Sequence, residues 1–334
     1  MATSIKDVAR EANVSIATVS RVLNNVDVVN EETKKKVLEA IEKLDYRPNI
    51  VARSLKTQKT KTIGIIIPDI SNPMYPEIVR GAEDVSNIYE YNIMLCNTDL
   101  DPQKELEYLR VLGEKMVDGV IYISNSLEPT IMKTIKDTNM PLVLIETNGR
   151  KTEYPSVVID NKQAAIDAVN YLINKGNKKI AYIGTDREAV NASAIRYDGY
   201  KCALKENNIS YNEDIVYFCK YSLKAEDGYE AMNSILEKAK DIDALFCVND
   251  ELAMGAINAL RNNEIRVPED VDVIGFNDTY GAEFFYPRLT TVAQPLYDMG
   301  SVATRMLIKK INNQPLDKKL FVLPYTLVER DSCK

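Results

Sequence analysis

The chain has 334 residues, 45% of them hydrophobic and 27% charged, so it is long enough for two core-bearing domains of an ordinary globular protein. It contains no histidine, which excludes Ser-His-Asp triads, Cys-His pairs and zinc sites with histidine ligands. The net charge of −7 is unevenly distributed along the chain: residues 1–62 hold 12 Lys and Arg against 8 Asp and Glu, and the remaining residues hold 30 Lys and Arg against 41 Asp and Glu. Only the N-terminal segment therefore suits a polyanionic partner.

Residues 3–13 predict a first short helix. Four apolar residues recur at helical spacing and would bury one face: Ile5, Val8, Ala9 and Ala12. Ser4, with Asp7 three residues later, fits a capping box, and Asn13 can take the left-handed conformation that ends a helix. The charges in this segment are not typical of a signal peptide. The five scattered cysteines lack CxxC spacing and indicate free thiols, so we expect a cytoplasmic protein.

The segment VSIATVSRVLN, residues 14–24, predicts a second helix capped by Ser15. Val19, Val22 and Leu23 recur at i, i+3 and i+4 and would form its buried stripe. The opposite face carries short side chains, hydroxyl groups and one guanidinium, with no acidic residue. A face of this composition suits a negatively charged partner.

A third helix completes this unit. Asn30 is its predicted cap, and Tyr46-Arg47-Pro48 ends it. Four apolar residues at helical spacing would close a small core: Val37, Ala40, Ile41 and Leu44. The first two helices, joined by a turn of about three residues, follow the helix-turn-helix plan. In that plan the second helix enters the DNA major groove.

The exposed face of the second helix has the chemistry of DNA recognition. Ile16 and Ala17 can contact thymine methyl groups, and Arg21 can bind guanine O6 and N7. The hydroxyl groups suited to phosphate contacts are those of Ser15, Thr18 and Ser20. The alternative is an ordinary three-helix bundle with a polar outer face.

The N-terminal segment also resembles a known family. Over residues 4–56 it is similar to the head of LacI/GalR-type transcription regulators, in the segments IKDVAREANVSIATVSRVLN and VNEETKKKVLEAIEKLDYRPNIVARSL. The similarity continues in the segment KTKTIGIIIPDISNPMYPEIVRGAED. Asn13 departs from the glycine that is usual in the family. The resemblance implies a helix-turn-helix domain at 1–48, a hinge helix with linker at 49–61, and a core at 62–334 that senses effectors and dimerises.

The resemblance further implies that a homodimer binds a pseudo-palindromic, double-stranded operator. Two hinge helices would pair in the minor groove, with Leu55 wedged into the central base step. Without the resemblance, residues 47–62 would be interpreted only as a linker rich in Lys and Thr. The residues and the resemblance together indicate these DNA contacts: Ser4, Ser15, Ile16, Ala17, Thr18, Ser20, Arg21, Asn24, Tyr46, Asn49, Ala52, Arg53 and Leu55.

From residue 62 onward, short apolar runs alternate with helical stretches. The runs are TIGIIIP, NIMLCN, DGVIYIS, PLVLIE, SVVID, KIAYIG, DALFCVN and VDVIGF. Such strands separated by helices predict an α/β fold with parallel sheets covered on both faces. About ten strands in roughly 270 residues predict two lobes. No run approaches the roughly 18–20 residues that span a bilayer, and the nucleotide motifs GxGxxG and GxxxxGK[ST] are absent.

The order of these elements resembles periplasmic sugar-binding proteins. The resemblance implies lobes of about 62–161 with 292–323 and of about 162–291, three crossovers, and a ligand cleft between them. In the family an arginine, an asparagine and an acid hold a sugar or purine. The matching positions are Arg196, Asn249 and Asn277; the last is an aspartate in most members, and here Asp278 follows it. The alternative is that Arg196 simply pairs with Asp250.

Two further segments, GAEDVSNIYEYNIML and QPLYDMGSVATRMLIKKI, resemble the catabolite control branch of the family. That branch takes a phosphorylated protein, HPr carrying a seryl phosphate, as its corepressor. The implied contact residues are Asp84, Tyr89, Tyr297, Asp298, Arg305 and Lys309. The apolar residues of the helix that starts near Tyr297 predict an outward stripe of Asp298, Ser301, Arg305 and Lys309. The alternative for each of these residues is an ordinary solvated surface.

The sequence therefore predicts a DNA-binding regulator of carbon catabolite repression, with seryl-phosphorylated HPr as corepressor. A local repressor of a sugar-utilisation operon, released by a small sugar, is the alternative within the family, and a sugar or sugar phosphate is a further candidate ligand. A transport component would need a signal peptide and would not need residues 1–60. We expect no enzymatic activity, cofactor, metal or membrane partner.

Overall fold

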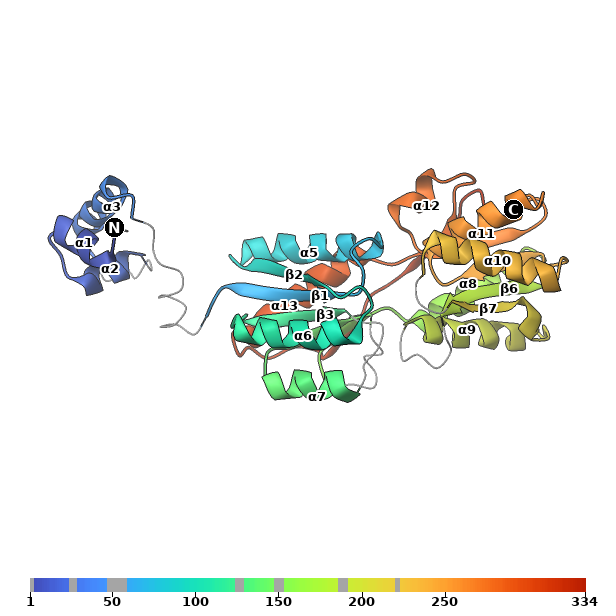
Figure 1. Cartoon of the computed structure of the whole chain (residues 1–334), viewed down its shortest axis with the longest axis horizontal. Helices are drawn as coiled ribbons and strands as arrows, with labels where there is room; N and C mark the ends of the chain where they lie inside the picture. Colours follow the sequence, from blue (N-terminus) through green and yellow to red (C-terminus); the bar gives the residue numbers. More distant parts are fainter. Residues whose placement is uncertain are drawn as a thin grey trace. The chain divides into compact units, whose positions relative to one another are not determined.

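The computed structural model describes residues 3–23, 29–46, 59–123, 129–146, 153–185, 192–219 and 223–334 (Figure 1). The chain divides into two compact units, Met1–Thr60 and Lys61–Lys334. Each unit has a hydrophobic core of its own. None of the helices within the described ranges is long and apolar enough to cross a membrane.

The first unit, the head, contains the helices α1 (Ile5–Glu11), α2 (Ile16–Leu23) and α3 (Glu31–Lys43). Seven residues from the three helices and the turn after α1 are buried in its core: Val8, Ala9, Ala12, Val19, Val22, Val37 and Ala40. Asn13, with a φ of 51°, makes the left-handed turn after α1. The hydroxyl of Ser15 accepts from the Thr18 amide at 3.1 Å, and the Asn30 side chain accepts from the Thr33 amide at 2.8 Å. The predicted turn and both predicted caps are confirmed.

The second unit, the core, contains two six-stranded sheets. The first sheet has the order β11-β5-β4-β3-β1-β2, and its strand pairs are parallel. Its strands are β1 (Thr62–Ile67), β2 (Asn92–Asn97), β3 (Gly119–Ile123), β4 (Leu142–Ile145), β5 (Ser156–Val158) and β11 (Leu320–Val322). The helices α5 (Met74–Ile88) and α13 (Leu296–Ile311) cover one face, and α6 (Pro102–Glu114) and α7 (Pro129–Thr138) cover the other (Figure 1).

The second sheet has the order β12-β10-β9-β8-β6-β7. Its strands are β6 (Ile180–Thr185), β7 (Val216–Cys219), β8 (Ala244–Cys247), β9 (Asp272–Asn277), β10 (Thr290–Ala293) and β12 (Thr326–Val328). The last of these runs antiparallel to β10, whereas the other pairs are parallel. The helices of this lobe are α8 (Asn161–Asn174), α9 (Ala192–Glu206), α10 (Ala225–Lys238), α11 (Asp250–Asn262) and the short α12 (Tyr280–Phe284), with a 3-10 turn at Glu213–Ile215.

The chain passes three times between the two sheets: after β5, after β10 and after β11. The lobe around the first sheet therefore combines residues 62–158 with residues 296–322. The lobe around the second sheet combines residues 161–293 with residues 326–334, because the C-terminal Ser332 also bonds to Val273 of β9. All eight apolar runs singled out in the sequence form strands. Four further strands, β7, β10, β11 and β12, were not singled out.

The two helices α5 and α13 lie in direct backbone contact, side by side on the first sheet (Figure 1). A Cβ atom on Gly81 of α5 would lie 1.9 Å from the carbonyl oxygen of Tyr297. A Cβ atom on Gly300 of α13 would lie 1.9 Å from the carbonyl oxygen of Ile78. No side chain fits at either position, so the two glycines set the distance between the helices.

Candidate functional sites

The helix α2 presents the predicted DNA-reading face. Val19 and Val22 are buried in the head, so the opposite side of the helix points outward. Ile16 is 44% exposed, and Ala17 and Arg21 are also exposed. This leaves small apolar groups and one guanidinium available to base edges, which is the combination that major-groove recognition uses.

The hydroxyl groups near this helix have partners inside the head. Ser15 and Thr18 hydrogen-bond to each other at 2.9 Å. The Ser4 amide donates to the Asp7 carboxylate at 3.0 Å, as expected for a capping box, and the Ser4 hydroxyl also donates to this carboxylate at 2.7 Å. Ser20 and Tyr46 are half-buried, the latter against the head core. Five predicted DNA contacts lie outside the described residues: Asn24, Asn49, Ala52, Arg53 and Leu55.

The predicted cleft lies between the two lobes of the core. A cavity of about 60 Å³ is lined by Glu146 of the first lobe and by Arg196, Asn249 and Asn277 of the second, among others. Three of these positions stand at or just beyond the carboxyl ends of strands β4, β8 and β9, where parallel α/β sheets commonly bind ligands. The structure thus brings together the three residues at the predicted positions, of which Arg196 and Asn249 agree with the family and Asn277 departs from it.

Arg196 is buried and paired. Its Nη2 lies 3.3 Å from Oε2 of Glu146, and its Nε and Nη1 donate at 2.8 Å to Asn161 and to the carbonyl of Val248. The guanidinium also stacks on the ring of Phe276, 3.7 Å from its centroid. The alternative that Arg196 pairs with Asp250 is wrong, because the partner is Glu146.

Glu146 was not predicted, although one signal pointed to it. It is the last letter of the run PLVLIE, an acid directly after a buried strand. Burial raises the pKa of its carboxyl, and the charge of Arg196 partly offsets that increase. Burial likewise lowers the pKa of Arg196. Two buried charges are therefore held as a pair across the lobes.

Asn249 and Asn277 reach the cavity from the second lobe. The Asn249 side chain caps α11 by accepting from the Leu252 amide at 2.9 Å, and it donates to the carbonyl of Leu223 at 2.9 Å. Asn277 has a φ of 110°, outside the usual range for a residue other than glycine. Strained backbone of this kind is common at binding sites because surrounding contacts hold it in place.

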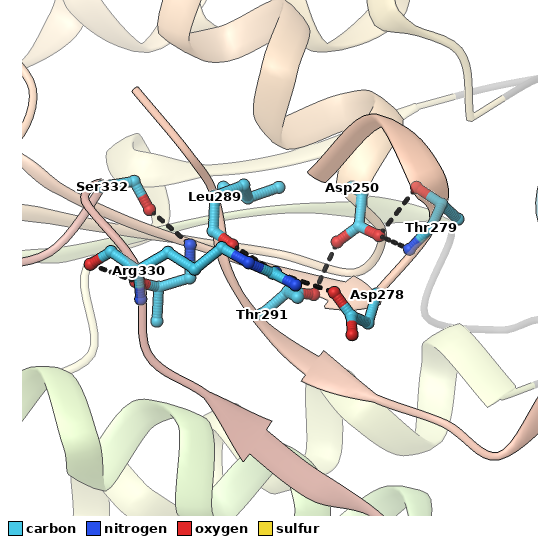
Figure 2. Close-up of polar contacts among 8 residues, drawn as sticks. Asp250, Asp278, Thr279, Leu289, Thr291, Arg330 and Ser332 are labelled. Carbon is cyan, nitrogen blue, oxygen red and sulfur yellow. Dashed lines mark hydrogen bonds and ion pairs between the residues drawn. The ribbon is translucent and has the colours of Figure 1, made fainter. Parts of the chain in front are cut away.

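Asp278 is not among the residues that line the cavity. Figure 2 shows its carboxylate facing Arg330, with Oδ1 2.7 Å from Nη1. Arg330 also donates to the carbonyl of Leu289 at 2.9 Å. The chain just after Asn277 is thus fixed by a residue near the C-terminus.

The neighbouring Asp250 is fully buried and has a separate set of hydrogen bonds (Figure 2). Its carboxylate accepts from the Thr279 amide at 2.7 Å, from the Thr279 hydroxyl at 3.0 Å and from the Thr291 hydroxyl at 2.6 Å. Burial raises the pKa of Asp250 to about 7, although these hydrogen bonds act in the opposite direction. Its role in the structure is to join α11 to the start of α12 and to β10.

The six residues of the predicted corepressor site lie on or beside α5 and α13; we call them the α5–α13 surface. The Tyr297 hydroxyl donates to Asp84 at 2.9 Å, which joins the two helices. Arg80 lies 3.6 Å from the other Asp84 oxygen; the sequence did not indicate this residue. The hydrogen bond to Asp84 raises the pKa of Tyr297.

The remaining residues of the α5–α13 surface are accessible to different degrees. Tyr89, Asp298 and Arg305 are exposed, whereas Lys309 is half-buried and pairs with Asp317 at 2.8 Å. The predicted outward stripe is wrong for Ser301, which is only 3% exposed. The reason is that α13 packs against α5 as well as against the sheet, so two sides of the helix are covered.

Comparisons with known proteins place the chain in a family. The model of bacterial regulatory proteins of the lacI family matches residues 4–49, and that of the periplasmic binding protein-like domain matches residues 169–333. The chain is 66% identical over 337 residues to the HTH-type transcriptional regulator RegA of Clostridium acetobutylicum and 42% identical over 335 residues to catabolite control protein A of Priestia megaterium, with 100% of both chains covered in each case.

A solved structure agrees with these relatives on the fold. The Lac repressor dimer bound to operator and the anti-inducer ONPF matches with a TM-score of 0.89 over 99% of each chain, at 24% identity. The predicted helix-turn-helix head and two-lobed α/β core are confirmed. The chain belongs to the LacI family of DNA-binding transcription regulators.

Proposed function

We propose that the protein is a homodimeric repressor of carbon catabolite genes whose corepressor, seryl-phosphorylated HPr, binds the α5–α13 surface. The observation that carries this proposal is a contrast between two arginines. Arg196, in the cleft where a small effector would bind, is buried and already paired. Arg305, on the α5–α13 surface, is exposed and forms no ion pair with any residue of the described ranges.

The α5–α13 surface has the charges that a phosphoserine requires. A phosphate carries a charge of roughly −1.5 to −2 and three acceptor oxygens, so it binds well to exposed guanidinium groups. Arg80 and Arg305 both lie close enough to Tyr297 to affect its titration. Lys309 is already paired with Asp317, so we expect Arg305 to contribute more to phosphate binding than Lys309.

The DNA-binding part of the proposal is supported by the head. A dimer presents two copies of α2, and two copies read a pseudo-palindromic operator when their spacing matches the helical repeat of DNA. The Lac repressor structure that this chain resembles is a dimer bound to operator. We propose the same assembly here.

The test compares two exposed arginines on the same lobe. Arg305→Ala should weaken binding of phosphorylated HPr at least about tenfold, because one charge-assisted contact to phosphate is lost. Arg110→Ala is the matched control, since Arg110 is exposed on α6, which covers the opposite face of the sheet. Calorimetry with phosphorylated and unphosphorylated HPr measures both. If Arg305→Ala binds both forms as the wild type does, the corepressor site is elsewhere.

A local repressor released by a small sugar or sugar phosphate is the second candidate. It is favoured by the polar side chains that converge in the cleft, Arg196, Asn249 and Asn277, and by the 66% identity to a relative named RegA rather than catabolite control protein A. This candidate predicts that a sugar alone changes operator affinity. Operator titration with sugars in the absence of HPr separates the two functions.

A further inference from the structure

Arg196 receives most of its contacts from its own lobe. Asn161 on α8, the carbonyl of Val248 after β8 and the ring of Phe276 on β9 all belong to the second lobe. They fix the plane of the guanidinium. The remaining donor, Nη2, faces the first lobe, where it meets Glu146. The second lobe therefore forms a preset site for one anion, and the first lobe supplies that anion.

Glu146 is held in a backbone conformation that aims it at this site. Its φ of 62° is left-handed, which is unfavourable for a glutamate, and it follows directly after β4. Its amide donates to the carbonyl of Val157 at 3.2 Å. The Gln294 amide, from the crossover after β10, lies 2.5 Å from the second carboxylate oxygen and 3.1 Å from Arg196. The carboxylate is thus contacted by the second lobe and by a connection between the lobes, whereas the first lobe holds the backbone of Glu146.

The space left beside this pair is too small for a sugar. The cavity measures about 60 Å³, whereas small-molecule sites measure about 300–1,000 Å³. The hollow next to it, about 270 Å³, is lined by a second ion pair between the lobes, Lys224 with Asp69 at 3.4 Å. A ligand that reaches Arg196 must therefore displace Glu146.

We infer that Glu146 is a tethered ligand: the cleft contains a carboxylate-binding site on Arg196, and the chain's own Glu146 occupies it and holds the two lobes together. The folded protein is strongly destabilised when a buried arginine loses its charged partner. An incoming anion can therefore take the place of Glu146 on Arg196. This inference is independent of the proposed HPr site, because it involves none of the residues of the α5–α13 surface.

The test replaces the tethered carboxylate with a free one. Glu146→Ala removes the side chain and leaves space beside Arg196. We expect the Tm of the full-length variant to fall by roughly 5–10 °C, because a buried charge loses its partner. Sodium acetate should raise that Tm by several degrees more than equal concentrations of sodium chloride or acetamide do. The wild type should respond equally to acetate and chloride, since its site is occupied.

Two controls locate the acetate effect. The double variant Glu146→Ala, Arg196→Ala should lose the specific response to acetate. Lys224→Ala breaks a second ion pair between the lobes, whose lysine is 52% exposed, and should gain no such response. If Glu146→Ala responds equally to acetate and chloride, the carboxylate site does not exist.

A second variant keeps the inference testable if Glu146→Ala does not fold. Glu146→Gln preserves the size of the side chain and removes its charge. Hydrogen exchange should then become at least about tenfold faster in residues 142–146 and 192–197, with the interior of β6 unchanged. Unchanged exchange at both lobe-facing segments would mean that Glu146 does not hold the lobes together.

Discussion

Arg21 of α2 has a side chain that can read a base. It is exposed on α2, and a guanidinium can bind guanine bidentately. We expect Arg21→Ala to cost about 1–3 kcal/mol on the specific operator and much less on random DNA. Lys35→Ala, on the exposed side of α3, is the control and should leave the ratio of the two affinities unchanged. Equal losses on both DNAs would make Arg21 a phosphate contact.

Asp250 gives the core a defined pH dependence. Its pKa is raised from 3.8 to about 7 in the folded protein, so between these values the unfolded chain has lost the proton that the folded chain keeps. The folded state binds more protons, and stability from this group therefore decreases as pH rises from about 4 to about 7. Below about pH 4 the ionisation of Asp250 does not change the free energy of unfolding. Above about pH 7 it lowers that free energy by a constant amount.

The measurement is urea unfolding of wild type and Asp250→Asn between pH 5 and pH 8. The free energy of unfolding of the wild type, minus that of the variant, should decrease as pH rises and level off above about 7. Asparagine removes the titrating group and retains its shape. A difference that does not vary with pH would show that Asp250 remains ionised throughout.

Single residues also mark the limit of what the sequence predicts. Asn13, Ser15 and Asn30 were assigned correctly because turns and caps depend on neighbours within a few positions. Arg196 was placed correctly in the cleft by resemblance. Its partner Glu146 lies 50 positions away and on another lobe. No local sequence pattern indicates that pairing, so it could be identified only from the structure.

At the scale of elements, the contact between α5 and α13 rests on Gly81 and Gly300. Gly81→Ala should push the helices apart and cost about 1–3 kcal/mol, as overpacking does in other cores. Gly113→Ala on α6 is the matched control, because no atom lies within 4 Å of its added Cβ. That change should be neutral or stabilise by up to about 1 kcal/mol. Urea unfolding measures both, and equal effects would refute the close contact.

Two of the four missed strands share a physical cause. The eight runs singled out in the sequence are mostly buried strands with continuous apolar letters, and the structure contains all of them. The missed β11 and β12 are three residues long and lie at sheet edges, where one side meets solvent. Their pairing is decided by the chain around them. Edge strands of this length leave almost no periodic signal.

At the scale of the whole molecule, the head and the core are linked through residues 47–58, which lie outside the described residues. Leu55 remains a prediction. If it enters the minor groove, Leu55→Ala should weaken operator binding and reduce the DNA bend, because an inserted apolar side chain supports the kink. The free energy of unfolding of the core should not change. FRET across a labelled operator measures the bend. An unaltered bend would show that Leu55 does not insert between the base pairs.

The three crossings between the sheets also determine the order in which the protein can fold during synthesis. Residues 3–46 contain everything the head core needs, so the head can fold early. The first lobe waits for α13 and β11, more than 130 residues after β5, and the second waits for β12. Contacts this distant along the chain form slowly. On the ribosome, a folded head would therefore precede two lobes that remain incomplete, with their apolar sheets open to chaperones, until residues 296–334 have emerged.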